Sequence, residues 1–340
     1  MNFSHNLFSK IISLENFYSA WREFRRGKGS RPDVQEFDFY LEDNLFRLAR
    51  ELEQKSYSHS NYAAFNINDP KPRRIHKASV RDRVVHQALF RQIQLLFDRT
   101  FIFDSYSCRT GKGTHRAVCR LEQFLRKATS NYHRNTFVLQ CDIQKFFYNI
   151  DHNILFNLIS KKVKDKEAIW LIQKVIKSFQ TEKDKGLPLG NVTSQLFANV
   201  YLNELDQFAK HNLKARYYIR YCDDFLIINN NISILSGIVI EINNFLNSKL
   251  DLDLHPKKII IKKLSQGVDF LDYINLPHYR VLRTRTKNRM LKRIKTARDN
   301  LETELIDQKK FKRILDSYFG LLSHCYGNNL KNEVKDLTKI

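Results

Sequence analysis

The sequence lacks the features that mark membrane-spanning, secreted or disulfide-bonded proteins. No apolar run among its 340 residues is long enough to cross a bilayer, and no basic amphipathic anchor is evident. The first residues lack a basic region followed by an apolar block and a small-residue cleavage site, so we expect no signal peptide. The five cysteines include no Cys-x-x-Cys pair, which indicates neither a zinc site nor a disulfide framework and favours a cytoplasmic location.

Acidic residues are scarce relative to basic ones. The chain has 58 Lys and Arg against 36 Asp and Glu, which gives a formal net charge of +22. Because so basic a balance implies a polyanionic partner, nucleic acid is the first candidate. A hydrophobic content of 42% and the length of the chain favour one large, multi-lobed enzyme with a sizeable core.

The stretch 217–229, YYIRYCDDFLIIN, is the most informative part of the sequence. Residues 217–221 and 225–228 are rich in β-branched and aromatic side chains, which predicts two buried strands. Residues 222–224, Cys-Asp-Asp, are short enough to form a tight hairpin turn between them. A solvated Asp-Asp turn is the common alternative. Here, however, Arg220 is the one charged residue in the flanks, and buried carboxylates are costly unless they are paired or bind metal.

A third carboxylate supports the metal-binding alternative. Residues 137–143, FVLQCDI, also resemble a buried strand, with Asp142 near its end, and Asp151 suits the N-cap of a following helix. If this strand lies beside the hairpin, Asp142, Asp223 and Asp224 meet at one end of a sheet. Three converging carboxylates form a hard-oxygen site suited to Mg²⁺. Two ions in such a site can support an in-line phosphoryl displacement.

The order of the motifs resembles that of reverse transcriptases. LQCDIQKFF, GLPLGNVTSQLFAN, YCDD and GVDFLDY follow one another as they do in that family. The chain is most similar to the reverse transcriptases of diversity-generating retroelements, which belong to the group II intron-like enzymes of bacteria and phages. These replace the usual Gln-Gly…Ser-Pro motif by an aliphatic-Gly…Ser-Gln form, and Leu189, Gly190, Ser194 and Gln195 fit that variant. Further matches at KPRRIHKASVRDRVVHQAL, GKGTHRAV and SYFGLLSHCYGNNL extend the resemblance over most of the chain.

The resemblance implies an α+β right-hand polymerase fold with fingers, a palm and a helical thumb. The palm carries an antiparallel sheet with the YCDD hairpin. We expect N-terminal helices and fingers over 1–135, the palm over 136–280 with a helical fingers insertion at about 153–185, and the thumb over 281–340. In this division no room remains for an RNase H, endonuclease or integrase domain.

The resemblance also implies a two-ion metal site. Asp142 and Asp223 are expected to bridge two Mg²⁺ ions, for which Mn²⁺ can substitute, while Asp224 supports the site and the carbonyl of Ile143 adds a ligand. One ion activates the primer 3′-hydroxyl, and the other holds the triphosphate and stabilises the leaving oxygen.

Other family positions concern the incoming nucleotide. Arg73, with Arg74 and Lys71 nearby, is expected to hold the triphosphate, because guanidinium groups bind phosphate oxygens bidentately; a solvated basic loop is the alternative. A lysine in the 257–258 pair is expected to protonate the pyrophosphate leaving group, and Lys258 is our candidate, although the sequence does not distinguish it from Lys257.

Phe147 lies where the family places an aromatic wall against the sugar, so it should exclude a 2′-hydroxyl; ordinary core packing is the alternative. The loop at Leu189 and Gly190 lies against the nascent base pair in the family. A leucine side chain there makes no polar contact with the base pair. This agrees with the low fidelity at template adenines that the resemblance implies. The glycine-rich stretch 111–116 lacks the Walker A spacing and is read as a template-backbone contact or a structural turn.

The N-terminal part is predicted to be helical. Phe17, Trp21 and Phe24 recur at helical spacing and are interpreted as core rather than as a base-stacking surface. A second helix is expected from Glu36, carrying Phe39 and the leucines that follow. At the other end, the basic stretch 283–300 is predicted to be a helix that lines the duplex backbone.

Together these features predict an RNA-directed DNA polymerase. The retroelement resemblance implies error-prone, adenine-mutagenic cDNA synthesis from a template-repeat RNA for targeted sequence diversification. The expected partners are template RNA, an RNA/DNA hybrid, dNTPs and a small basic accessory protein that forms a ring, with no membrane, in a bacterial or phage-encoded cytoplasmic setting. One alternative is a related bacterial reverse transcriptase from a defence system, a retron or a group II intron, although the Ser194-Gln195 pair and the lack of maturase or endonuclease segments argue against the intron type. The other is a non-catalytic RNA-binding protein on the same fold.

Overall fold

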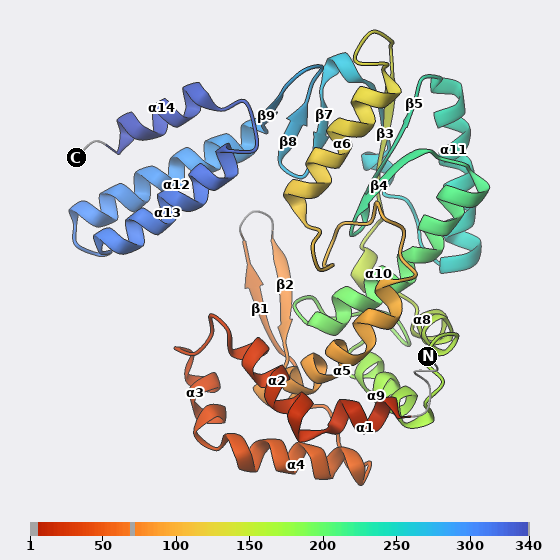
Figure 1. Cartoon of the computed structure of the whole chain (residues 1–340), viewed down its shortest axis with the longest axis vertical. Coiled ribbons are helices and arrows are strands. Elements are labelled where there is room, and N and C mark those ends of the chain that lie inside the picture. The colour runs from red at the N-terminus through yellow and green to blue at the C-terminus, as the bar shows by residue number, and fades with distance from the viewer. Residues whose placement is uncertain (1–5, 69–71, 339–340) are drawn as a thin grey trace.

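The computed structural model describes residues 6–68 and 72–338. Figure 1 shows N-terminal helices at one end, a central sheet with its covering helices, and a group of C-terminal helices to one side. Helices and antiparallel strands are mixed along the chain, as the predicted α+β class requires. Within the described residues, no helix combines the length and the apolar character that a bilayer crossing needs.

The N-terminal region is built from four helices packed around a longer one. They are α1 (Leu7–Ile12), α2 (Leu14–Arg25), α3 (Pro32–Phe39) and α4 (Leu41–Glu53), and the longer helix is α5 (Val80–Asp98). The aromatic stripe on α2 is buried, which confirms that it is core. The single helix expected from Glu36 is wrong, because Pro32 starts α3 earlier and the chain breaks at Tyr40. Phe39 therefore lies at an exposed corner, with 80% of its surface accessible.

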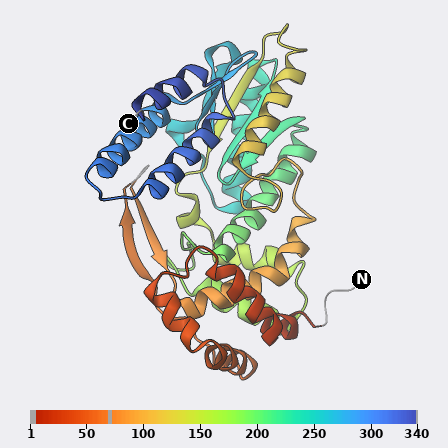
Figure 2. The same cartoon turned by 60° about the vertical axis from the view of Figure 1, so that its left-hand side comes forward.

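A two-stranded antiparallel hairpin projects from this region toward the C-terminal helices (Figures 1 and 2). It consists of β1 (Ala63–Ile67) and β2 (Arg73–Lys77), with Ile67 opposite Arg73. Lys71, which is expected near the triphosphate, falls in 69–71 and lies outside the described residues.

The central sheet has four antiparallel strands in the order β4-β5-β3-β6. Their bounds are β3 (Phe137–Asp142), β4 (Tyr217–Tyr221), β5 (Asp224–Asn229) and β6 (Ile260–Lys263). The turn between β4 and β5 contains two residues rather than the expected three, because Cys222 adopts a positive φ of 57° and Asp224 already pairs in β5.

Helices cover both faces of this sheet, so alternate strand residues enter two separate cores. One core joins Leu139 and Phe225 to residues of α8 (His152–Ser160), α9 (Lys166–Lys177), α10 (Val192–Gln207) and α11 (Ile232–Phe245). The other joins Val138 and Ile219 to α6 (Thr114–Ala128) and to the C-terminal helices. The predicted N-cap of α8 is confirmed, since Asp151 accepts the N–H groups of Asn153 and Ile154, each at 2.8 Å.

A three-stranded sheet leads from the central region to the C-terminal helices. It contains β7 (Val268–Phe270), β8 (Tyr273–Asn275) and β9 (Arg280–Leu282). Leu271 and Asp272, in the turn between the first two strands, have φ of 50° and 73°. Aspartate tolerates this left-handed conformation better than most residues with a Cβ.

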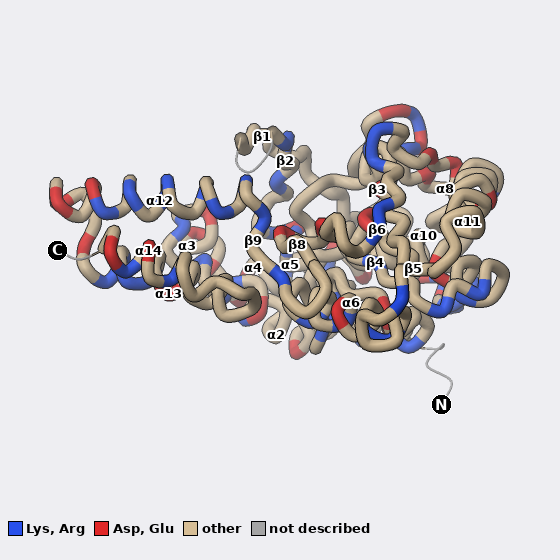
Figure 3. Tube along the Cα trace, turned by 90° about the horizontal axis from the view of Figure 1, so that it is seen from above, with Lys and Arg blue, Asp and Glu red and all other residues tan. Residues whose placement is uncertain are grey.

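The chain continues as α12 (Thr284–Glu302), α13 (Gln308–Leu322) and α14 (Asn328–Leu337). Figure 3 shows basic residues recurring along α12, in the stretch predicted to be a basic helix. The expected boundary between palm and thumb, at 280/281, falls inside β9. The expected boundary between fingers and palm, at 135/136, falls between α6 and β3. The domain limits stay a prediction.

Candidate active site

The structure brings the three predicted aspartates together. Asp142 is the last residue of β3 and pairs with Asp224, the first residue of β5. Asp223 lies in the adjoining turn. All three line one cavity of about 680 Å³. The convergence follows from the strand order, because the hairpin strand β5 lies directly beside β3 with this register.

Electrostatic repulsion and burial act on the cluster. Burial, followed by the charges of Asp142 and Asp223, raises the pKa of Asp224 to about 7. Burial and then Asp142 also raise the pKa of Asp223. In addition, the Oδ1 atom of Asp224 is buried without a hydrogen-bond partner. A group of carboxylates in this condition is stabilised by an added positive charge.

Lys258 supplies one such charge. Its Nζ lies 2.7 Å from Oδ1 of Asp142, and it lines the same cavity. Lys257 does not line this cavity and is exposed. The structure therefore separates two lysines that the sequence could not distinguish. The general-acid role of Lys258 stays a prediction.

The donor set fits a divalent cation, although it is not arranged as a ready metal cage. No group of three or more His, Cys, Asp or Glu side chains in the described ranges meets the geometry of a metal site. Oδ1 of Asp224 is nevertheless buried without a hydrogen-bond partner, and burial and Asp142 raise the pKa of Asp223, so a bound cation would stabilise both carboxylates. Ile143 is buried and lines the cavity, but its role as a carbonyl ligand stays a prediction.

The predicted nucleotide-binding residues surround the same cavity. Arg73 and Arg74 reach it from the end of β2, while Phe147 and Leu189 contribute from the central region. Phe147 also packs partly against the core, with its ring centroid 5.3 Å from that of Phe146. Both of its predicted environments, the cavity wall and the core, are thus present at one position.

The Leu189–Gly190 loop is attached to the projecting hairpin. The backbone N–H of His76 donates to the carbonyl of Leu189 at 3.4 Å. Gly190 has a φ of +115°, a conformation that residues with a side chain disfavour. A Cβ at this position would lie 3.5 Å from Cγ2 of Ile75, which is an ordinary van der Waals contact. Glycine is therefore needed for the backbone conformation rather than for space. Gly190 itself does not line the cavity.

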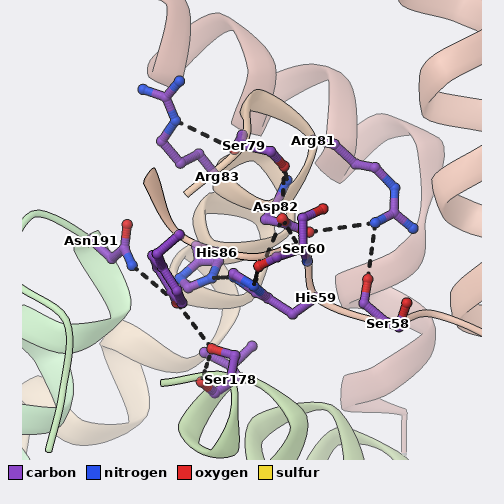
Figure 4. Close-up of polar contacts among 12 residues, drawn as sticks. Ser58, His59, Ser60, Ser79, Arg81, Asp82, Arg83, His86, Ser178 and Asn191 are labelled. Atoms are coloured by element: carbon purple, nitrogen blue, oxygen red, sulfur yellow. Dashed lines mark hydrogen bonds and ion pairs between the residues drawn. The ribbon is translucent and has the colours of Figure 1, made fainter. Parts of the chain in front are cut away.

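A buried carboxylate organises the start of α5 (Figure 4). Asp82 accepts hydrogen bonds from the Tyr57 hydroxyl at 2.8 Å, the Ser79 hydroxyl at 2.7 Å and the Ser60 N–H at 3.1 Å. Burial favours the protonated acid, but the Ser79 bond and the nearby His59 outweigh it and lower the pKa of Asp82. These bonds hold the segment before β1 against α5.

Two histidines extend this network to α10. His86 Nε2 lies 3.0 Å from His59 Nε2, and His86 Nδ1 lies 2.6 Å from the hydroxyl of Thr193. Burial lowers the pKa of His86 to about 3, so the ring is neutral near pH 7. Next to it, Tyr62 contacts the Ser178 hydroxyl at 2.9 Å and accepts a bond from Asn191 at 3.4 Å (Figure 4). The N-terminal region is therefore fixed to the helix that follows the Leu189 loop.

The glycine-rich stretch at 111–116 forms a turn before α6. Gly113 has a φ of 115° and its N–H donates to the carbonyl of Tyr106 at 3.0 Å. The Lys112 ammonium bonds the carbonyl of Phe103 at 2.8 Å. These contacts give the stretch a structural role, and a template contact stays a prediction.

Sequence reasoning missed one residue beside the aspartates. Arg220 is fully buried behind the turn and forms an ion pair with Asp206. The available signal was that Arg220 is the one charged residue in an otherwise apolar strand. Its partner gave no signal, because Asp206 lies on a helix 14 positions earlier.

Comparison with known proteins identifies the family of the chain. A family model described as reverse transcriptase (RNA-dependent DNA polymerase) matches residues 67–274. The chain belongs to the reverse transcriptase family. Its mixed helices and antiparallel sheet therefore form the right-hand polymerase fold. The assignment of the β1–β2 hairpin to the fingers, of the central sheet to the palm and of α12–α14 to the thumb stays a prediction.

The curated relatives of this reverse transcriptase include intron-encoded proteins. The Group II intron-encoded protein LtrA of Lactococcus lactis subsp. cremoris is 22% identical, over 78% of this chain and 56% of LtrA. The Putative COX1/OXI3 intron 2 protein of Saccharomyces cerevisiae is 21% identical, over 57% of this chain and 29% of that protein. Protein YkfC of Escherichia coli is 24% identical, over 57% and 61% of the two chains. The chain thus spans less than two thirds of the length of each of these relatives.

A solved structure is also similar. The apo telomerase from Candida tropicalis, truncated from its C-terminal domain, aligns with a TM-score of 0.47 and 12% identity. The alignment covers 68% of this chain and 57% of that chain.

Proposed function

We propose that this reverse transcriptase copies RNA into DNA at the cavity between fingers and palm. The observation that carries the proposal is the register that sets Asp142 opposite Asp224 and beside Asp223. Arg73 and Arg74 line the same cavity, so anion-binding and cation-binding groups face one space. Template RNA, an RNA/DNA hybrid and dNTPs are the substrates that suit such a site in a chain of net charge +22.

The acidic and the basic residues of the cavity have different proposed roles. Asp142, Asp223 and Asp224 would hold Mg²⁺ or Mn²⁺, which supplies charge stabilisation for the primer hydroxyl and the leaving phosphate oxygens. The guanidinium groups of Arg73 and Arg74 bind and orient the triphosphate.

Two further residues act on the reacting groups. Lys258, held at Asp142, carries a proton that the departing pyrophosphate can accept. Phe147 lines the cavity from the palm and excludes a 2′-hydroxyl from the sugar position.

The proposed subtype is the enzyme of a diversity-generating retroelement. Leu189 and Gln195 support it, because both line the cavity and both depart from the usual Gln-Gly…Ser-Pro form of the family. In this proposal the enzyme makes adenine-mutagenic cDNA from a template-repeat RNA, in a bacterial or phage-encoded cytoplasmic setting, with a small basic ring-forming protein as partner. An intron, retron or defence-system enzyme is the alternative, and the intron-encoded relatives favour it.

Primer extension on a defined RNA template tests the activity. The purified chain should extend a DNA primer with dNTPs and Mg²⁺, whereas Asp223→Asn should lose synthesis while retaining RNA binding. Binding without synthesis by the wild-type chain would favour a non-catalytic RNA-binding protein. The subtype is tested by searching the neighbouring DNA for a near-duplicate repeat pair that differs at adenines; its absence would favour the alternative.

A further inference from the structure

A buried ion pair lies behind the turn that carries Asp223. Arg220 on β4 and Asp206 near the end of α10 are both inaccessible to solvent. Nε and Nη2 of Arg220 lie 2.7 and 2.6 Å from the two carboxylate oxygens of Asp206. Such a two-pronged contact fixes the plane of the guanidinium group as well as its position.

The other N–H groups of Arg220 reach three further residues. Nη1 donates to the carbonyl of Cys222 at 2.9 Å and to Oδ1 of Asn199 at 3.2 Å. Nη2 also donates to the hydroxyl of Ser105 at 3.1 Å. Together with the bonds to Asp206, these contacts use all five donors of the guanidinium group. No other side chain offers five donors in one plane, so the site is specific for arginine.

The contact with Cys222 bears directly on the aspartate turn. Cys222 has a φ of 57°, in the left-handed region that a residue with a Cβ seldom adopts. Such a conformation persists where the surroundings hold it. The bond from Arg220 holds the Cys222 carbonyl, and the peptide unit that contains this carbonyl leads directly to Asp223.

Stability alone does not account for this arrangement. A buried ion pair adds little net stability, and an apolar pair of similar volume is often as stable. An apolar pair cannot, however, donate a hydrogen bond to the Cys222 carbonyl. The fully bonded guanidinium group is therefore better explained by the orientation that it gives to the turn.

We propose that Arg220 is a positioning residue for the metal-binding turn. Asp206 fixes the guanidinium group, which fixes the Cys222 carbonyl and so sets the place of Asp223 relative to Asp142. The inference rests on the proposed function, because it assigns Arg220 a role at the same site.

Two variants separate positioning from stability. Arg220→Lys keeps the charge, but its single nitrogen cannot serve Asp206 and the Cys222 carbonyl with the same geometry. The double variant Arg220→Met/Asp206→Leu removes both charges and leaves no unpaired ion. Arg83→Lys is the matched control, since Arg83 bonds Asp33 at 3.0 Å in the fingers.

The measurements are the thermal unfolding midpoint, steady-state kinetics of single-dNTP addition, and Mn²⁺ affinity by electron paramagnetic resonance. In folded Arg220 variants we expect kcat to fall about 100-fold, as misplacement of a reacting group by about 1 Å does. KM for the dNTP should stay within about twofold, because Arg73 and Arg74 are unchanged. The Arg220 variants should bind Mn²⁺ about 10-fold more weakly than the wild type. Arg83→Lys should match the wild type in kcat and in Mn²⁺ affinity.

The outcomes separate this inference from the proposed function. If the wild type polymerises and the folded double variant keeps its kcat and Mn²⁺ affinity, the ion pair is only structural and the inference is overturned. If the wild type does not polymerise, the proposed function fails, and the Mn²⁺ comparison with Arg83→Lys still decides the positioning role. Should Arg220→Lys fail to fold, the charge-balanced double variant provides the same comparison.

Discussion

The ammonium group of Lys258 lies 2.7 Å from Oδ1 of Asp142, which ties the loop before β6 to the end of β3. The first prediction follows from this contact. Lys258→Gln should lower kcat for dNTP addition by about 10²- to 10⁴-fold, the usual contribution of a general acid. Lys257→Gln is the matched control, because Lys257 is exposed and does not line the cavity. Pre-steady-state single-turnover rates measure the effect, and equal losses in both variants would contradict it.

The second prediction concerns sugar selection. Phe147→Ala should raise ribonucleotide incorporation relative to deoxynucleotide incorporation by about 10-fold or more, since a wall of the cavity is removed. Single-nucleotide extension with paired dNTP and rNTP substrates gives the ratio. Phe39→Ala controls for aromatic truncation in general, because that side chain is 80% exposed and does not line the cavity. An unchanged ratio would leave Phe147 as core.

The third prediction concerns fidelity at template adenines. Leu189 lines the cavity and makes no side-chain hydrogen bond to a substrate, whereas glutamine can. One net hydrogen bond is worth about 0.5–1.5 kcal/mol, or roughly 2- to 13-fold in selectivity. Leu189→Gln should therefore reduce misincorporation opposite adenine by a factor in that range, with smaller effects at other bases. Sequencing of cDNA from one defined RNA measures it, and Leu189→Met, which stays apolar, serves as the control.

The fourth prediction concerns the pH dependence of stability. The pKa of His86 falls from 6.5 to about 3 on burial, so the unfolded chain binds a proton that the folded chain excludes. Stability from this group is present above pH 6.5 and is lost as the pH falls toward 3. Between pH 7 and pH 5 the loss is about 2 kcal/mol.

Urea unfolding at both pH values checks this expectation. His86→Gln, which cannot titrate, should lose about 2 kcal/mol less stability than the wild type between pH 7 and pH 5. Asp82, whose pKa is lowered mainly by the Ser79 hydrogen bond against the effect of burial, is present in both proteins and therefore contributes to both curves. Identical losses in the two proteins would show that His86 is not the responsible group.

Local patterns predicted the strands and the turn that carry the three aspartates. Apolar flanks around a Cys-Asp-Asp sequence specify two buried strands and a turn, and Asp142 ends a third strand of the same character. Local patterns do not show which strands lie side by side. The order of the motifs gave this information, because it assigned all three strands to one palm. The register of β3 with β5 then followed only from the structure.

Contacts between distant segments were not predictable in the same way. His86 and Thr193 are separated by 107 positions, and neither residue stands out from the sequence pattern of its own helix. Arg220 and Asp206 are closer in sequence, but one lies on a strand and the other on a helix, so no single periodicity relates them. The helix end at Tyr40 was missed because the apolar spacing continues past this residue, whereas the backbone leaves the helical conformation there.

The two cores on the faces of the palm sheet have a consequence for biosynthesis. Residues of the first core run from Leu7 to Leu254, whereas those of the second extend to Val334 in α14. During translation, the fingers and one face of the sheet can be completed while the opposite face still awaits helices not yet made. On that face α6 is already made and covers part of the sheet, but Met290, Leu322 and Val334 of the same core are added only when α12–α14 emerge from the ribosome. This interval is therefore the stage at which a nascent-chain chaperone is most needed.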